Sequence, residues 1–274
     1  MIFLDILNSC HCICAHRGFR SHRPENTISA FLASIGHCHF IEMDIQMSKD
    51  AIPMVIHDPI LSRTSDAKIK RQQLGLQSLK VSNWTAPQLK KLDMGSWFIT
   101  TDPFSTIQKG EVSVEEITCD LPQTIITLEE LLNHPMLHNI PINIEIKDHN
   151  GTDHNHIVVQ TVVDTIVKTQ AKTRVLISSF NHRYLLEAKE MAADITTAAL
   201  QKETNPPDLI NYLKSLGVKA YHPHENLVDK DLFSQLRNAG FFINIYTVND
   251  TLKWRKYFGL GATAIITDFP TLQY

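Results

Sequence analysis

The stretch 41–58 carries the residues best suited to chemistry. Glu42 and Asp44 alternate with apolar residues, so both carboxylates leave the same face of a predicted strand. A second apolar run, 54–56, begins only a few residues later. So short a connection joins antiparallel strands, because a parallel crossover needs roughly a dozen residues or more. The predicted hairpin brings His57 roughly opposite Asp44 and places an imidazole beside two acids.

Two other predicted strand ends carry side chains of the same kinds. His16 and Arg17 end an apolar run, and Gly18 after them permits a sharp turn. Glu145 and Lys147 share one face near the end of an alternating run. We expect all these side chains to converge at one mouth. The seven candidates are the acids Glu42, Asp44 and Glu145, the histidines His16 and His57, and the cations Arg17 and Lys147.

The charges of these seven residues indicate a reaction class. Three acids would repel one another without a cation among them, and an all-oxygen set selects a hard ion, Mg²⁺ or Ca²⁺. The two cations beside that ion predict an anionic ligand, and we expect phosphate. The two histidines can exchange protons near neutral pH. Together they predict a metal-assisted phosphoester hydrolase.

The elements that must position these residues follow a βα rhythm. Six apolar runs predict further strands, and helical patterns fill the gaps between them. With the strands that end at His16 and carry Glu42, they make eight parallel strands plus one antiparallel hairpin arm. Eight βα units over 274 residues predict a TIM (β/α)8 barrel. The six runs are 142–146, 175–177, 195–199, 218–221, 241–246 and 264–266, and the helical patterns include 157–167, 184–189, 209–216, 232–239 and 251–258.

The rhythm breaks after the hairpin. Lys and Gln accumulate over 68–77, and only a weak helical pattern follows around 86–92. We therefore expect a small, partly helical insertion over about 59–126, and one barrel domain over 1–274. A short helix over 128–132 should precede the next strand.

Composition and net charge limit the classes of binding partner and the cellular compartment that we expect for this chain. A net charge of -3 and a pI near 6.5 argue against a nucleic-acid or membrane-surface partner. Cys10, Cys12 and Cys14 alternate along a predicted strand and cannot all pair with each other, which favours packing in a reducing compartment, the cytoplasm. The apolar stretch 1–7 lacks a basic n-region, so we expect neither a leader nor a membrane span. The sequence carries no signal for an oligomeric state.

At this point the ordered motifs resemble those of the glycerophosphodiester phosphodiesterase family over nearly the whole chain. The most specific are those that contain the seven candidates. The matching motifs are His16-Arg17-Gly18, Pro24-Glu25-Asn26-Thr27, Glu42-x-Asp44, His57-Asp58 with Leu61-x-Arg63-Thr64, and Glu145-x-Lys147, together with segments at 92–98, 178–180 and 246–249.

The resemblance implies a TIM barrel that converts a glycerophosphodiester and water to glycerol 3-phosphate and an alcohol. It also implies that the three acids hold a divalent ion, that His16 and His57 are catalytic, and that Arg17 and Lys147 hold the phosphate. Two departures stand out. Ala51 occupies a turn position where the family usually has Gly, and Tyr246 stands where it often has Trp, in the wall that bears on head-group preference.

Two alternative functions remain open. The first retains the chemistry but changes the substrate, as in a lysophospholipase D-like or phosphatidylinositol phospholipase C-like enzyme, and requires an apolar rim or membrane-docking surface around the mouth. The second is a non-catalytic barrel that binds a phosphorylated ligand, and it predicts the loss of a metal ligand or a proton-transfer residue.

Overall fold

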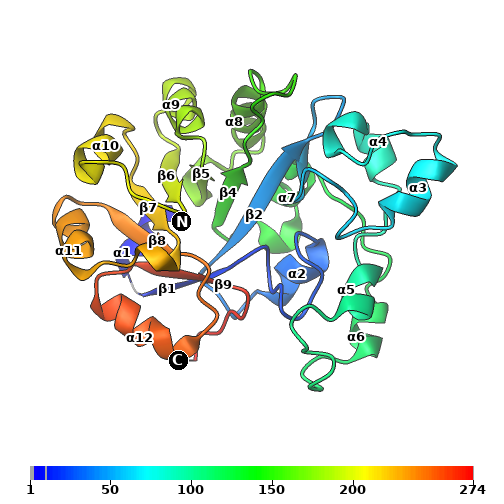
Figure 1. Cartoon of the computed structure of the whole chain (residues 1–274), viewed down its shortest axis with the longest axis horizontal. Coiled ribbons are helices and arrows are strands. Elements are labelled where there is room, and N and C mark those ends of the chain that lie inside the picture. Colours follow the sequence, from blue (N-terminus) through cyan, green and yellow to red (C-terminus); the bar gives the residue numbers. More distant parts are fainter. Residues whose placement is uncertain (1–2, 10, 274) are drawn as a thin grey trace.

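The computed structural model describes residues 3–9 and 11–273. Within these ranges the chain forms a closed barrel of eight parallel strands, with β1 paired to both β2 and β9, and the antiparallel arm β3 paired to β2 (Figure 1). The predicted TIM barrel and its hairpin arm are confirmed. The strands are β1 Cys12–Ala15, β2 Phe40–Met47, β3 Pro53–Val55, β4 Ile142–Ile146, β5 Val175–Ser179, β6 Thr196–Gln201, β7 Ala220–Pro223, β8 Phe242–Ile245 and β9 Ala264–Thr267.

Helices follow the strands and surround the barrel, as the predicted βα rhythm requires. The predicted helical patterns all lie on helices, and their ends differ by at most three residues, as is usual for helix ends. The helices are α1 Phe3–Ser9, α2 Ile28–Ala33, α3 Ala67–Gln73, α4 Ala86–Leu89, α5 Ser96–Thr101, α6 Val114–Thr118, α7 Leu128–Leu132, α8 Val158–Lys168, α9 His182–Met191, α10 Leu209–Ser215, α11 Lys230–Asn238 and α12 Thr251–Gly259.

The hairpin has nearly the predicted register. Ile45 pairs with Val55, and the N–H of Ile56 donates to the carbonyl of Asp44 at 3.0 Å. His57 therefore lies one residue beyond the position opposite Asp44. The turn residue Ala51 has a φ of +60°, the left-handed conformation that favours Gly.

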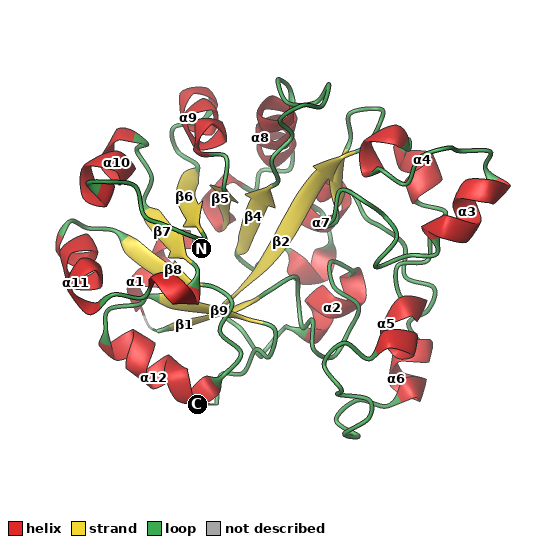
Figure 2. Ribbon diagram, in the orientation of Figure 1, coloured by secondary structure: helices red, strands yellow, loops and turns green. Residues whose placement is uncertain are grey.

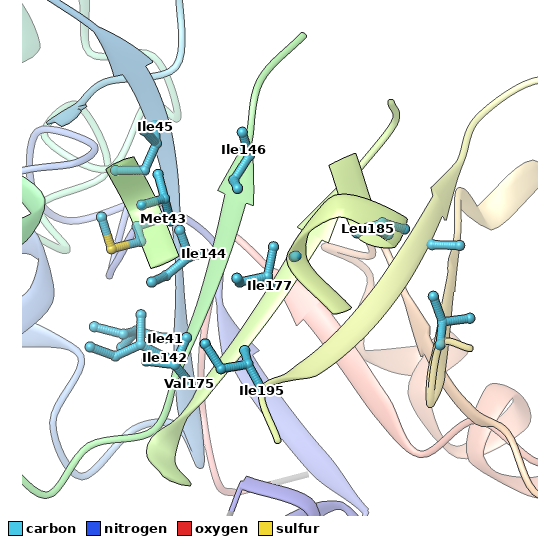
Figure 3. Packing of buried hydrophobic residues seen from close by; sticks show 14 of the residues in the cluster. Ile41, Met43, Ile45, Ile142, Ile144, Ile146, Val175, Ile177, Leu185 and Ile195 are labelled. Carbon is cyan, nitrogen blue, oxygen red and sulfur yellow. The ribbon is translucent and has the colours of Figure 1, made fainter. Parts of the chain in front are cut away.

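Two apolar layers fix where a pocket can form. The outward-facing side chains of the strands pack against the surrounding helices, and Figure 3 shows this layer between β2 and β4, with Ile41, Met43 and Ile45 beside Ile142 and Ile144. The inward-facing side chains form a second cluster together with α1. Because the α1 side chains contact the amino-terminal part of the strands, the open end of the barrel is the carboxyl end.

The helix α1 includes residues 3–7 of the apolar stretch 1–7 discussed above. Cys12 and Cys14 are buried, and the thiol of Cys12 donates to the carbonyl of Ile6 at 3.3 Å. The prediction for Cys10 lies outside the described residues. No helix among the described residues combines the length and apolarity needed to cross a membrane.

The segment predicted as an insertion, 59–126, leaves the barrel between β3 and α7. It contains α3 to α6, which lie together to one side of the barrel in Figure 2. Its apolar residues form two clusters, one around Trp84 that also includes Met54 and Ile56 of the hairpin arm, and one around Phe98.

Candidate active site

The seven predicted residues come together at the carboxyl end of the barrel. They come from the carboxyl ends of β1 and β4, from the middle of β2 and from the segment after β3. Asp44 is fully buried. The other six line one cavity of about 260 Å³: His16, Arg17, Glu42, His57, Glu145 and Lys147.

The backbone after β1 turns sharply to aim its side chains. Arg17 and Gly18 both have a positive φ, +57° and +81°. A Cβ at Gly18 would lie 2.6 Å from the backbone carbon of Ala30 in α2, so only glycine fits there. The turn also lets the N–H of Arg17 donate to Oε2 of Glu42 at 3.0 Å. The first strand is thereby fixed to the acid on the second.

Glu42, Asp44 and Glu145 form a buried acidic cluster with one oxygen from each within 4.8 Å of the others. Burial and the neighbouring carboxylates raise the pKa of Glu42 well above its usual value. Its buried Oε1 has no hydrogen-bond partner among the described residues. A set of carboxylate oxygens with a buried, unpartnered acceptor fits a hard divalent cation. These residues could therefore hold a metal ion.

Both predicted phosphate-binding cations contact this cluster. Nζ of Lys147 lies 2.7 Å from Oδ1 of Asp44 and 2.5 Å from Oε1 of Glu145, while Nε of Arg17 lies 3.2 Å from Oδ2 of Asp44. Burial alone would raise the pKa of Asp44, but Lys147 and Arg17 hold it well below its usual value. Two cations thus face the three carboxyl groups of the cluster.

Each predicted histidine is held by a carboxylate. Nδ1 of His16 lies 2.7 Å from Oδ1 of Asp268, and Nδ1 of His57 lies 2.6 Å from Oδ1 of Asp58. Burial and the charge of Arg17 lower the pKa of His16, although Asp268 opposes this shift. An imidazole that is neutral at neutral pH and held through Nδ1 leaves Nε2 for a reacting group.

The two His–Asp pairs are joined through Glu25. Its carboxylate accepts from Nη1 of Arg17 at 2.9 Å, from Nε of Arg20 at 2.8 Å and from Nη2 of Arg63 at 2.7 Å. Arg20 also donates to Asp268 at 3.1 Å, and Arg63 to Asp58 at 2.5 Å. A buried carboxylate with three guanidiniums therefore links the residues behind both histidines.

The patterns in the sequence assign no role to Asp268 or Arg20, and they give Glu25 only as part of a motif. Asp268 directly follows β9, so the strand-end rule that selects Glu145 could have selected it too. Arg20 lies in a loop, where no periodicity indicates its direction. Another contact without such a signal is that of Asn26, whose Nδ2 donates to Oδ2 of Asp44 at 2.8 Å.

Comparisons with known proteins show what the chain is similar to. Residues 16–272 match the model of the glycerophosphoryl diester phosphodiesterase family. A glycerophosphodiester phosphodiesterase of Bacillus altitudinis is 32% identical over 262 residues, which cover 94% of each chain. A crystal structure from Silicibacter pomeroyi superimposes with a TM-score of 0.82 at 22% identity, covering 98% of this chain and 94% of the other. An Oleispira antarctica phosphodiesterase in complex with the product sn-glycerol-3-phosphate has a TM-score of 0.76 at 24% identity, with 97% and 96% covered.

Proposed function

The chain belongs to the glycerophosphoryl diester phosphodiesterase family, and from this premise we propose that its barrel hydrolyses glycerophosphodiesters to glycerol 3-phosphate and an alcohol. The observation that carries the proposal is one cavity that joins an acidic cluster, two cations and two carboxylate-held histidines. Each of these parts can contribute to phosphodiester hydrolysis.

Glu42, Asp44 and Glu145 are the residues that would hold a divalent cation, Mg²⁺ or Ca²⁺. When bound, the ion would neutralise charge on the phosphoryl oxygens. The cluster offers only oxygen ligands, which both of these hard ions accept.

Arg17 and Lys147 orient the phosphate. Their positive charges lie beside the acidic cluster and pair with its carboxylates in this structure. A bound anionic substrate would supply negative charge to the same two side chains. Burial would lower the pKa of Lys147, but Asp44 and Glu145 raise it, so the ammonium stays charged.

His16 and His57 share the acid and base roles. Asp268 and Asp58 hold the two Nδ1 atoms, so each imidazole can move a proton at Nε2. One removes a proton from the attacking oxygen, and the other supplies one to the leaving alkoxide. Asp268 and Asp58 are positioning residues in this scheme.

The non-catalytic alternative predicts a missing ligand or proton-transfer residue, and all seven predicted residues lie in or directly behind the cavity. We retain as further proposals one barrel domain over 1–274 with its insertion at about 59–126, and a cytoplasmic location. Free Cys14, Cys38 and Cys119 support the location.

The test measures release of glycerol 3-phosphate from glycerophosphocholine with EDTA, and then with Mg²⁺ or Ca²⁺ added back. We expect chelator-sensitive release by the wild type and by the exposed control Glu190→Ala, and none by Glu42→Ala. Release that persists in EDTA would exclude the metal-dependent scheme. If no ion supported release, glycerophosphocholine hydrolysis would be excluded.

A further inference from the structure

The cavity has a second wall that the proposed chemistry does not use. β6 and β7 lie across the closed barrel from β1 and β2. The residues Lys202 and His224, which directly follow β6 and β7, line the cavity together with Phe180 and Tyr246. A phosphate bound at the acidic cluster would direct one of its ester groups toward this wall.

The wall is held in place by its own contacts. The carbonyl of Gln201 accepts from the hydroxyl of Tyr246 at 3.0 Å and from the N–H of His224 at 2.8 Å. The Tyr246 ring makes edge contacts with Phe180 and His224, with ring centroids 6.0 and 5.5 Å apart. Since Lys202 is the residue after Gln201, these bonds place the start of its side chain at the wall.

The charge of the wall indicates what it binds. Lys202 is exposed and forms no ion pair with any described residue, whereas Arg17 and Lys147 are both paired with acids. The neighbouring Glu203 is exposed and does not line the cavity. Among the acids that do line it, Glu145 is bonded to Lys147. An ammonium without an ion-pair partner repels a cationic head group, although the neighbouring aromatic rings could otherwise bind such a group through cation–π contacts.

We propose that Lys202, supported by His224, forms a subsite for a phosphodiester whose alcohol carries its own negative charge, a carboxylate or a second phosphate. This inference rests on the proposed function and names the substrate class of the same site. The ammonium attracts the anion, and Nε2 of His224, which has no hydrogen-bond partner among the described residues, supplies a second polar contact.

The test compares two substrates that differ by one carboxylate, glycerophosphoserine and glycerophosphoethanolamine, with Mg²⁺ or Ca²⁺ present. We expect the wild type to have the higher kcat/KM for glycerophosphoserine. Lys202→Gln should lower the ratio of the two kcat/KM values about threefold, and Lys202→Glu should lower it further. Salt at about 0.5 M should lower the wild-type ratio, because the contact is exposed to solvent.

Lys214→Gln is the matched control, because Lys214 is exposed on α10 and lines no described cavity. Tyr246→Phe tests whether Tyr246 positions Lys202. We expect a partial fall in the ratio of the two kcat/KM values, because the hydrogen bond from the Tyr246 hydroxyl to the carbonyl of Gln201 is lost. An unchanged ratio in both Lys202 variants would overturn the subsite and leave the proposed function intact. Wild-type protein that hydrolyses neither substrate would instead overturn the proposed function and the subsite with it.

Discussion

At the scale of single residues, the site is built from histidines whose orientation depends on a second side chain. An imidazole can transfer a proton at Nε2 only if the tautomer and the ring direction are fixed at Nδ1. Asp268 and Asp58 provide this at 2.7 and 2.6 Å. Asp268 is itself held by Asn249, which donates to it at 2.8 Å.

Asp268→Asn should therefore lower kcat by about 100-fold and leave KM nearly unchanged. The amide is the same size, but it can present its N–H to Nδ1 and favour the wrong tautomer. Steady-state kinetics on glycerophosphocholine provide the measurement, with Asp164→Asn, an exposed carboxylate on α8, as the control. A kcat close to the wild-type value would show that Asp268 does not orient His16.

Glu25 is the residue on which the arginines depend. Its pKa is held well below the usual value by hydrogen bonds and charges from Arg63, Arg17 and Arg20, against the effect of burial. Glu25→Gln leaves three guanidiniums without this counter-charge, so we expect the free energy of unfolding to fall by about 3 kcal/mol.

Urea unfolding at pH 7 measures this loss. The control is Glu187→Gln, which breaks a solvent-exposed pair with Arg183 and should cost less than about 0.5 kcal/mol. Equal losses in the two variants would contradict a special role for the buried carboxylate.

At the scale of elements, the hairpin of β2 and β3 delivers His57 to the acids, and its turn is strained. Ala51 has a φ of +60°, a conformation that is unfavourable for a residue with a Cβ. The strain is local because the register on either side of the turn is regular. The turn thus tolerates Ala at a cost in stability and without a change of geometry.

Ala51→Gly should raise the free energy of unfolding by about 0.5 kcal/mol, since relief of the left-handed strain exceeds the added freedom of the unfolded chain. Thermal unfolding gives the measurement. Gly36→Ala is the reverse control: its φ is +82° with nothing within 4 Å of the new Cβ, so only backbone strain is added and stability should fall. A lower midpoint temperature for Ala51→Gly would refute this account.

At the scale of the whole molecule, closure of the barrel buries polar groups whose ion binding and protonation depend on the metal concentration and the pH of the solution. The acidic cluster responds to cations and the buried histidines respond to pH. Both groups couple to global unfolding, because the unfolded chain has neither the cluster nor the burial.

A bound divalent ion should stabilise the fold. At a concentration 100 times the Kd, Mg²⁺ or Ca²⁺ should raise the free energy of unfolding by about 2.7 kcal/mol, and EDTA should reverse the effect. Thermal scans of wild type and Glu42→Gln measure this, with NaCl of equal ionic strength as the control. A rise of equal size in Glu42→Gln would place the ion elsewhere.

His222 provides the pH response. It is buried in β7, accepts from Nδ2 of Asn244 at 2.9 Å, and burial lowers its pKa to about 3. The unfolded residue has a pKa of about 6.5 and so binds the proton more tightly. Stability is therefore complete above about pH 6.5 and is lost as pH falls toward 3, by about 2 kcal/mol between pH 7 and pH 5.

Urea unfolding at the two pH values should show this loss in the wild type and a smaller loss in His222→Gln, whose side-chain oxygen can still accept from Asn244. His149, with a pKa lowered to about 4 by burial and by His154, contributes in the same direction and remains in the variant. Identical slopes for the two proteins would exclude His222 as a source of the pH dependence.

Much of this molecule follows from short-range patterns. Alternation places Glu42 and Asp44 on one strand face, and a short connection forces β3 to run antiparallel to β2. The βα rhythm predicts the barrel, and the strand-end rule brings the seven candidates to one mouth. The strand faces and the hairpin depend on residues within one or two elements, and the barrel follows from the same local pattern repeated along the chain, so the sequence by itself determines them.

Only the tertiary structure decides how the candidates are supported. His16 and Asp268 are separated by 252 positions and meet because β9 closes the barrel beside β1. Likewise, Lys147 contacts Asp44 because β4 and β2 are neighbours. No local sequence period encodes such contacts, because they depend on which strands become neighbours in the barrel. They also depend on which charged side chains become buried there and therefore need a counter-charge.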